Sequence, residues 1–455
     1  MKFFLYLTAT VLSLGLSYQS QAQQITIDKQ TFRFGGYTKT GIGSSQGGVT
    51  QADFKAPGAQ SKYRLGNEAN NYLEYQLSYE YMLNREKGKS FEFVYMGSGY
   101  SEFEKTSQFA INDINQLYVK MNNLYNNIDV WLGRRYYYRK SIQILDHWWL
   151  NPDSQAQGAI GVEGLRRKDK SDDIKIALFK YEDPKAKAFN PKIDSAKEGT
   201  LNSYKLDARW VDIPVNKGGT LNFVVDYSVR AARKDLGFDS KNGFGLGLWH
   251  EQKDLFGGKV KNTFAVLYRK GTSIIHQHTY SGVANRENEL SSQYDIGYNL
   301  DKAYSFEVNN NAFIEYDKQF SLEGNLMYHI ENQGVIPYNY RTGKKIVIGD
   351  NVQWFSTGFR YLYYLHKHLN LALEVGADYV DNKTVTNMRH VTGWLTKITF
   401  SPQISWNYGY WSRPVIRPFI TYAFWDKSMK RLVGNTPYSN RTDGFTFGAQ
   451  LEIWW

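Results

Sequence analysis

The chain has 455 residues, with 55 Lys and Arg against 44 Asp and Glu, a net charge of +11 and no cysteine. Without cysteine, disulfide bonds and thiolate metal sites are excluded as sources of stability. The basic residues are scattered among acidic ones rather than clustered, so we expect no nucleic acid among the partners.

The N-terminus is typical of a cleaved secretory signal peptide. A basic start at Lys2 and a mostly apolar run over 3–16 precede a Ser-Gln-Ala sequence that ends at Ala22. Small residues of this kind are those that signal peptidase recognises. We therefore predict a signal peptide over 1–22 and a single domain over 23–455, with a buried N-terminal strand or helix as the alternative.

The composition of the remaining chain indicates a membrane-spanning β-barrel. No later segment has the ~18 consecutive apolar residues that a transmembrane helix requires. Aromatic residues make up 16% of the chain, although its mean hydropathy is only −0.53. A barrel combines these properties, because lipid-facing and water-facing residues alternate along its strands and aromatic residues mark both interfaces.

Segments that alternate between apolar and polar residues recur along the chain. They cover residues 63–81, 371–379, 394–406, 413–424 and 445–455. At about 24 residues per strand and loop, the length accommodates about eighteen strands, with sixteen or twenty as alternatives. We predict an all-β fold, a transmembrane antiparallel barrel. A soluble propeller or β-sandwich array is the alternative, and a propeller would usually show a blade repeat.

Four aromatic residues stand on the polar faces of these segments. They are Tyr37, Tyr72, Trp411 and Trp454, each beside charged or amide residues. An aromatic ring in a wet lumen suits a pyranose, which has an apolar CH face and a rim of hydroxyls. By analogy with bases, each stack contributes about 1–3 kcal/mol. A row of such weak subsites would let an oligosaccharide slide through. Packing under an inward-folded loop is the alternative.

Five stretches of the chain resemble the maltoporin family of outer-membrane porins. They are FGGYTKTGIG (34–43), GAQSKYRLGNE (58–68), WLGRRYYYR (131–139, followed by ILD at 144–146), WSRPVIR (411–417) and FGAQLEIWW (447–455). The similarity is dense at both ends and thin from about 165 to 390. It implies an eighteen-stranded barrel, a homotrimer in outer-membrane lipid, and a loop folded inward to constrict each pore.

The resemblance also implies that malto-oligosaccharides pass along a slide of aromatic residues. The family's slide positions fall on the same four residues that the alternation selects. A slide aromatic that the family takes from a neighbouring subunit corresponds to Phe103 or Phe109. A mid-chain phenylalanine of the slide falls in a gapped region near Phe256 to Phe264.

Polar tracks flank the slide in this family. Arg64, Glu74, Arg139 and Asp146 match the track residues as they stand. Lys39 replaces an arginine, which keeps the positive charge but loses the planar guanidinium group that can bond two hydroxyls. Trp148 replaces a constriction tyrosine and Asn115 an arginine, and the family's usual cysteine pair is absent. Two alternatives remain: Arg139 and Asp146 could pair to pin the inward loop, and Lys39 could be a lumen charge without a sugar contact.

No enzyme signature stands out, since nucleophile-elbow, zinc-protease and phosphate-loop motifs are absent from the sequence. We therefore expect no catalytic residue, metal site or cofactor. A hydrolase that uses Glu102 and Glu104 is an alternative. The prediction is an outer-membrane channel for maltose and maltodextrins; a porin for another sugar, such as sucrose, or a general diffusion pore are the alternatives.

Overall fold

The computed structural model describes residues 23–152, 156–166, 171–190, 195–236, 239–276, 296–298, 300–332, 335–339, 351–383 and 390–455. The signal peptide predicted over 1–22 lies outside the described residues.

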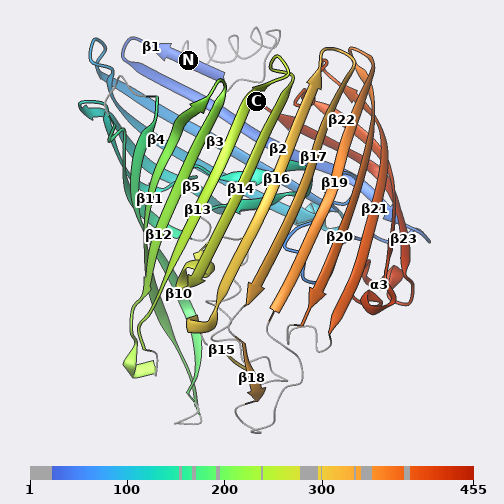
Figure 1. Cartoon of the computed structure of the whole chain (residues 1–455). Helices are drawn as coiled ribbons and strands as arrows, with labels where there is room; N and C mark the ends of the chain where they lie inside the picture. The colour runs from blue at the N-terminus through green and yellow to red at the C-terminus, as the bar shows by residue number, and fades with distance from the viewer. Residues whose placement is uncertain are drawn as a thin grey trace.

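In the described part of the chain, eighteen strands form one closed antiparallel barrel (Figure 1). Their bounds in chain order are β2 (Gln30–Ser45), β3 (Asn70–Asn84), β4 (Lys89–Glu102), β5 (Ala110–Tyr125), β6 (Ile128–Arg134), β9 (Ala156–Glu163), β10 (Asp173–Asn190), β11 (Ser195–Asn216), β12 (Gly219–Arg230), β13 (Lys241–Leu255), β14 (Val260–Gly271), β16 (Tyr304–Tyr316), β17 (Phe320–Asn332), β19 (Asn351–His366), β20 (Leu369–Asn382), β21 (Val391–Ser405), β22 (Val415–Trp425) and β23 (Asp443–Trp454). Each strand pairs with the next, and β23 pairs with β2 to close the ring. The predicted fold is confirmed.

Smaller elements lie outside this ring. They are β1 (Gln23–Ile27), β7 (Lys140–Ile142), β8 (His147–Leu150), β15 (Ile296–Tyr298), β18 (Val335–Asn339), the short helix α3 (Asn435–Tyr438) and the 3-10 turns η1 (Phe103–Gln108), η2 (Gln143–Leu145), η3 (Lys234–Leu236), η4 (Thr272–His276), η5 (Leu300–Lys302) and η7 (Lys427–Met429). Strand β1 pairs with the first residues of β2, beyond the point where β23 ends. None of the helices in the described ranges is long and apolar enough to cross a membrane.

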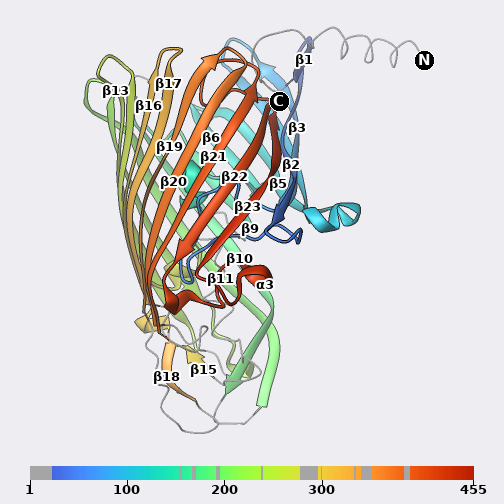
Figure 2. The same ribbon diagram turned by 90° about the vertical axis from the view of Figure 1, so that its right-hand side faces the viewer.

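The two ends of the barrel differ (Figure 2). Strand β1 and the C-terminus lie at the end where most connections are short turns, such as residues 85–88 and 317–319; we call this the terminal end. The other end, which we call the loop end, carries long connections and α3.

Side chains alternate across the wall as the sequence predicts. In β22, Ile416, Ile420 and Phe424 are 44–52% exposed on the outer face, whereas Val415 and Thr421 are buried on the inner face. The period of two places every apolar residue of this row toward the membrane. The outer wall is therefore apolar and the inner wall carries the polar groups.

The connection 46–69 between β2 and β3 folds into the barrel. The sequence predicts an alternating strand from residue 63, but β3 begins only at Asn70. The preceding residues instead pack against the inner wall, where the Tyr63 hydroxyl lies 3.0 Å from Ser356 Oγ and 3.2 Å from Asn325 Oδ1. The sequence analysis predicts one inward-folded loop, and this connection is an additional one that it does not predict.

The connection 135–152 between β6 and β9 is the inward loop that the resemblance implies. It contains β7, η2 and β8. His147 Nε2 lies 3.0 Å from Oε1 of Glu307 on β16, and Arg269 on β14 donates to the Trp149 carbonyl at 3.1 Å. The loop is thus held against the wall far from its own strands.

We expect Gly376→Ala to displace the loop 46–69. A Cβ at Gly376 would lie 2.0 Å from Cδ2 of Tyr63, so the ring must move and the packing should lose about 1–3 kcal/mol. The variant should unfold at a lower temperature, followed by circular dichroism, and its open-channel conductance should change. Gly324→Ala on β17 is the control, since its Cβ would meet nothing within 3.7 Å. Equal effects of the two variants would contradict this account.

Candidate functional site

Five aromatic rings form a continuous row on the inner wall. Successive ring centroids are 6.1 Å apart for Tyr72 and Tyr37, and 6.5 Å for Tyr37 and Trp454. The row continues from Trp454 to Trp411 at 6.3 Å, and from Trp411 to Phe313 at 6.2 Å. We call these five residues the aromatic row.

The row crosses the seam at which the barrel closes. Tyr37 on β2 stands directly opposite Trp454 on β23, although the two residues are 417 positions apart in the sequence. On the other side of β2, Lys39 stands opposite Tyr72 on β3. The strand register therefore brings three of the four predicted aromatic residues together. Trp411 joins them from the turn 406–414, because β22 begins only at Val415.

Phe313 is the member that the sequence analysis does not identify. It lies on the inner face of β16, in line with Asn309 and Glu307. Neither phenylalanine at the ends of the range expected to hold the mid-chain slide residue belongs to the row. Phe256 is 82% exposed in a turn, and Phe264 is 39% exposed on the outer face of β14. The rule that selects the other four, an aromatic residue on the polar face of an alternating segment, also applies to Phe313.

The two candidates for an aromatic residue donated to a neighbouring subunit pack on their own chain here. The Phe103 ring lies beside Gly41 of β2, and the Phe109 ring lies beside Gly99 of β4. Their role in a trimer stays a prediction.

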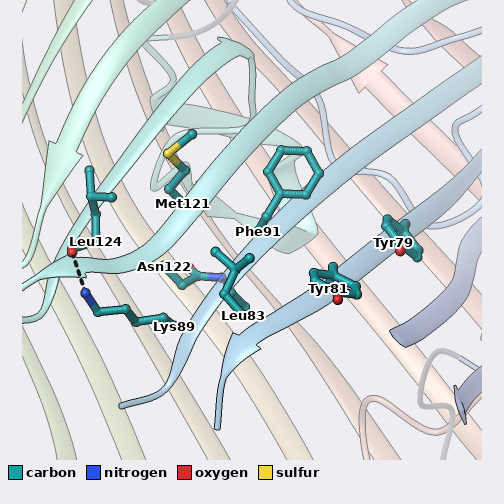
Figure 3. Close-up of a pocket in the computed structure, with 9 residues that line it drawn as sticks. Tyr79, Tyr81, Leu83, Lys89, Phe91, Met121, Asn122 and Leu124 are labelled. Carbon is teal, nitrogen blue, oxygen red and sulfur yellow. Dashed lines mark hydrogen bonds between the residues drawn. The ribbon is translucent and has the colours of Figure 1, made fainter. Parts of the chain in front are cut away.

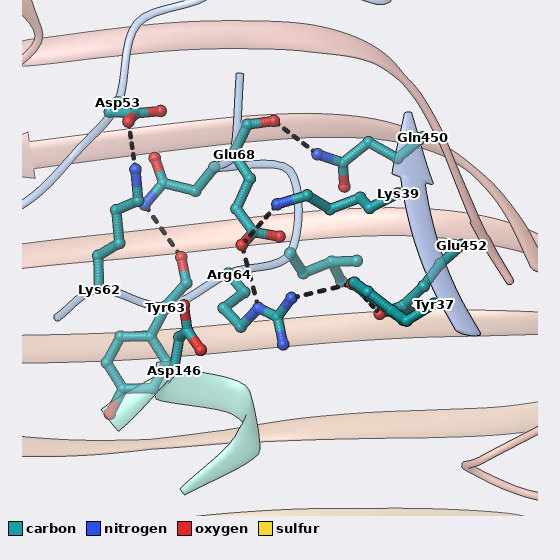
Figure 4. Close-up of polar contacts among 12 residues, drawn as sticks. Tyr37, Lys39, Asp53, Lys62, Tyr63, Arg64, Glu68, Asp146, Gln450 and Glu452 are labelled. Carbon is teal, nitrogen blue, oxygen red and sulfur yellow. Dashed lines mark hydrogen bonds and ion pairs between the residues drawn. The ribbon is translucent and has the colours of Figure 1, made fainter. Parts of the chain in front are cut away.

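A chain of polar contacts runs beside the middle of the row (Figure 4). The Glu68 carboxylate accepts from Lys39 Nζ at 2.9 Å and from Arg64 Nε at 3.1 Å. Arg64 also donates to the Tyr37 hydroxyl at 3.4 Å, and that hydroxyl donates to Glu452 at 2.9 Å. Lys39 and Arg64 are thus brought together, and both are oriented by one carboxylate.

Burial disfavours the charged form of Glu68, but Arg64 and Lys39 outweigh it and lower the pKa of this carboxyl to about 2. Glu68 is therefore ionised at neutral pH and fixes two cations at the edge of the row. The Gln450 amide donates to the Glu68 carbonyl at 2.8 Å, which ties the loop 46–69 to the closing strand.

The Arg413 guanidinium lies against one face of the Trp454 ring. The guanidinium carbon of Arg413 lies 4.1 Å from the ring centroid, a cation–π distance. Glu452 holds this group, with Oε2 at 2.8 Å from Arg413 Nε and at 2.6 Å from Arg417 Nη1. One face of the indole is thereby covered, so a solute can approach only the other.

A second polar cluster surrounds Glu74 at the Tyr72 end of the row. Its Oε1 accepts from the hydroxyls of Tyr72 at 2.6 Å and Tyr136 at 2.9 Å, and from Asn115 Nδ2 at 3.1 Å. The replacement of an arginine by Asn115 therefore keeps a donor to Glu74. Tyr136 is not among the residues selected from the sequence. It links the inward loop 135–152, which we call the constriction loop, to this carboxylate.

Arg139 lies between two aromatic rings of the constriction loop. Its guanidinium carbon is 3.4 Å from the Tyr136 ring centroid and 5.6 Å from that of Trp148. The Trp148 indole donates to Asp146 Oδ1 at 3.3 Å, and Asp146 itself is exposed. Arg139, Asp146 and Trp148 are thus adjacent. Within the described ranges, no group of three or more His, Cys, Asp or Glu is placed to hold a metal ion.

The family model described as LamB porin matches residues 32–455. Among solved structures, the outer membrane channel DcaP of Acinetobacter baumannii is similar, with 10% identity, 96% of this chain and 100% of that chain covered, and a TM-score of 0.46. OprB of Pseudomonas putida, in a high-pH structure, has 9% identity, the same two coverages and a TM-score of 0.40. Neither likeness bears on the solute.

We expect the stability that Glu68 contributes to depend on pH in one direction. Its pKa is lower in the folded chain, about 2, than the ordinary value of 4.5. The contribution, roughly 3 kcal/mol, should be fully present above pH 4.5 and be lost as the pH falls toward 2. Thermal unfolding of the wild type and of Glu68→Gln across pH 2–7 measures it. The difference between them should shrink with acidification; a constant difference would contradict the assignment.

Proposed function

This chain belongs to the LamB porin family, and we propose that it conducts maltose and maltodextrins by facilitated diffusion along the aromatic row. Membership of a porin family and the barrel fold point to a channel in the outer membrane rather than to an enzyme. The proposal includes the predicted homotrimer and the passage of malto-oligosaccharides.

The observation that carries the proposal is the continuity of the aromatic row. Five rings follow one another at centroid distances of 6.1–6.5 Å on the inner wall. A packed hydrophobic core would bury such rings, but Trp411 is 44% exposed. Rings that are accessible on one side offer a stacking surface to the apolar face of a pyranose, at about 1–3 kcal/mol each by analogy with bases.

Polar groups beside the row supply partners for hydroxyls. Lys39 and Arg64 stand on one side of Tyr37, and Glu74 stands beside Tyr72. Hydrogen bonds to charged groups contribute about 1.5–3 kcal/mol each before desolvation is counted. Several weak subsites in series support conduction, since each must bind a solute and also release it.

A channel for another sugar, such as sucrose, is the second candidate. It is favoured by Trp148, which stands in the constriction loop where the family has a tyrosine and which contacts both Arg139 and Asp146. A bulkier ring at this position changes the shape of the narrowest part of the path. A general diffusion pore would need no row of rings.

The proposal is tested by sugar block of the purified channel in planar lipid bilayers. We expect maltohexaose to close the ion current at millimolar or lower concentrations and sucrose to do so far less well. Equal block by both sugars would favour the second candidate. If neither sugar blocked the current, the channel would be a general diffusion pore and the proposal would be wrong.

Single-ring variants test the row itself. Trp454→Ala and Phe313→Ala should each weaken maltohexaose block about tenfold, the size of one lost stack, and change ion conductance much less. Trp394→Ala and Phe264→Ala are matched controls, because both rings are exposed on the outer face of the barrel. The row would be excluded as a sugar path if all four variants kept the wild-type block.

A further inference from the structure

A groove on the outer wall lies beside the terminal end of the barrel (Figure 3). Its volume is about 460 Å³. Its lining includes Tyr81 and Leu83 of β3, Lys89 and Phe91 of β4, and Met121 and Leu124 of β5. The groove is separate from the lumen, because most of these side chains belong to the outward rows of their strands.

The lining is suited to a hydrocarbon chain. Leu83, Met121 and Leu124 are 44–59% exposed on the outer wall, and the ring of Phe91 lies beside them. Tyrosine residues at the same level are typical of the border between hydrocarbon and water. The groove therefore begins within the apolar band and opens toward the headgroups.

Basic residues surround the open end of the groove. Lys29, Arg85, Lys87 and Lys89 lie in or next to the turns at this end, against Asp28 and Glu86. Arg85 and Asp28 contact each other, with 3.8 Å between their charged atoms. Because the basic residues outnumber the acidic ones, the open end of the groove carries a net positive charge.

Lys89 is the cation that borders the groove itself. Its Nζ donates to the Leu124 carbonyl at 3.1 Å, which holds the ammonium across the mouth between β4 and β5. An ammonium has three donors, so this contact leaves two for a ligand. A phosphate at the mouth would meet both the fixed charge and the surrounding basic turns.

We propose that this groove is a binding site for one anionic phospholipid, with an acyl chain along Leu83, Phe91 and Met121 and the headgroup phosphate on Lys89. Charge at the mouth selects this occupant. A second groove, on the outer face of β2, β21, β22 and β23, is larger at about 630 Å³ but has no charged residue in its lining. It therefore lacks the means to select a headgroup.

Native mass spectrometry of the full chain, purified in detergent, tests the proposal with phosphatidylglycerol and phosphatidylcholine as probes. We expect phosphatidylglycerol to be retained in preference. Lys89→Gln should weaken its retention about fivefold, as for one lysine at an anionic surface, and leave phosphatidylcholine unchanged. Lys259→Gln, at another turn of the terminal end beside Tyr316, is the matched control and should change neither.

Leu83→Trp gives a second readout, because a larger side chain fills the apolar part of the groove. It should reduce the retention of both lipids, while circular dichroism and open-channel conductance show that the barrel is intact. The proposal is overturned if the wild type retains the two lipids equally. It is also overturned if Lys259→Gln weakens phosphatidylglycerol as much as Lys89→Gln, or if Leu83→Trp has no effect.

Discussion

Backbone hydrogen bonding between β2 and β23 closes the barrel, and the placement of every other group depends on that closure. In hydrocarbon an unpaired amide has no water to bind, so an open sheet edge is strongly unfavourable. The closing register sets Tyr37 opposite Trp454 and Lys39 opposite Glu452. Because the side chains alternate, a shift of this register by one residue would turn the side chains of one of the two strands to the opposite face.

Charged residues on the inner wall explain why two connections fold inside. Glu374 of β20 is fully buried and lies 2.5 Å from Arg360 Nη2 and 2.9 Å from Lys397 Nζ. It also accepts from the backbone amide of Leu65 at 3.0 Å, while Lys397 donates to the carbonyl of the same residue at 2.6 Å. Buried charges require such partners. The loop 46–69 supplies them from its backbone, so the wall and the loop stabilise each other.

The alternation of residues predicted the barrel and its outer face, since a period of two is a local property. It also predicted the inward orientation of Tyr37, Tyr72 and Trp454, which lie within strands. It was wrong for the segment 63–69, where apolar residues pack under other strands instead of facing lipid. Phe313 lies on β16, in the part of the chain where the resemblance to the family is thin, so no matching motif indicates it. Contacts such as Arg413 on Trp454 depend on how a turn folds, which a local pattern does not specify.

The environment of each ring decides how a solute could use the aromatic row. Arg413 covers one face of Trp454, and Glu452 holds the hydroxyl of Tyr37. Glu74 holds the hydroxyl of Tyr72 in the same way. These contacts orient Tyr37, Tyr72 and Trp454, and each of the three rings offers the face that its partners leave open. Fixed rings about 6 Å apart mean that a solute leaving one ring already approaches the next. In the sugar path proposed above, such spacing would lower the barrier between neighbouring subsites without deepening any one of them.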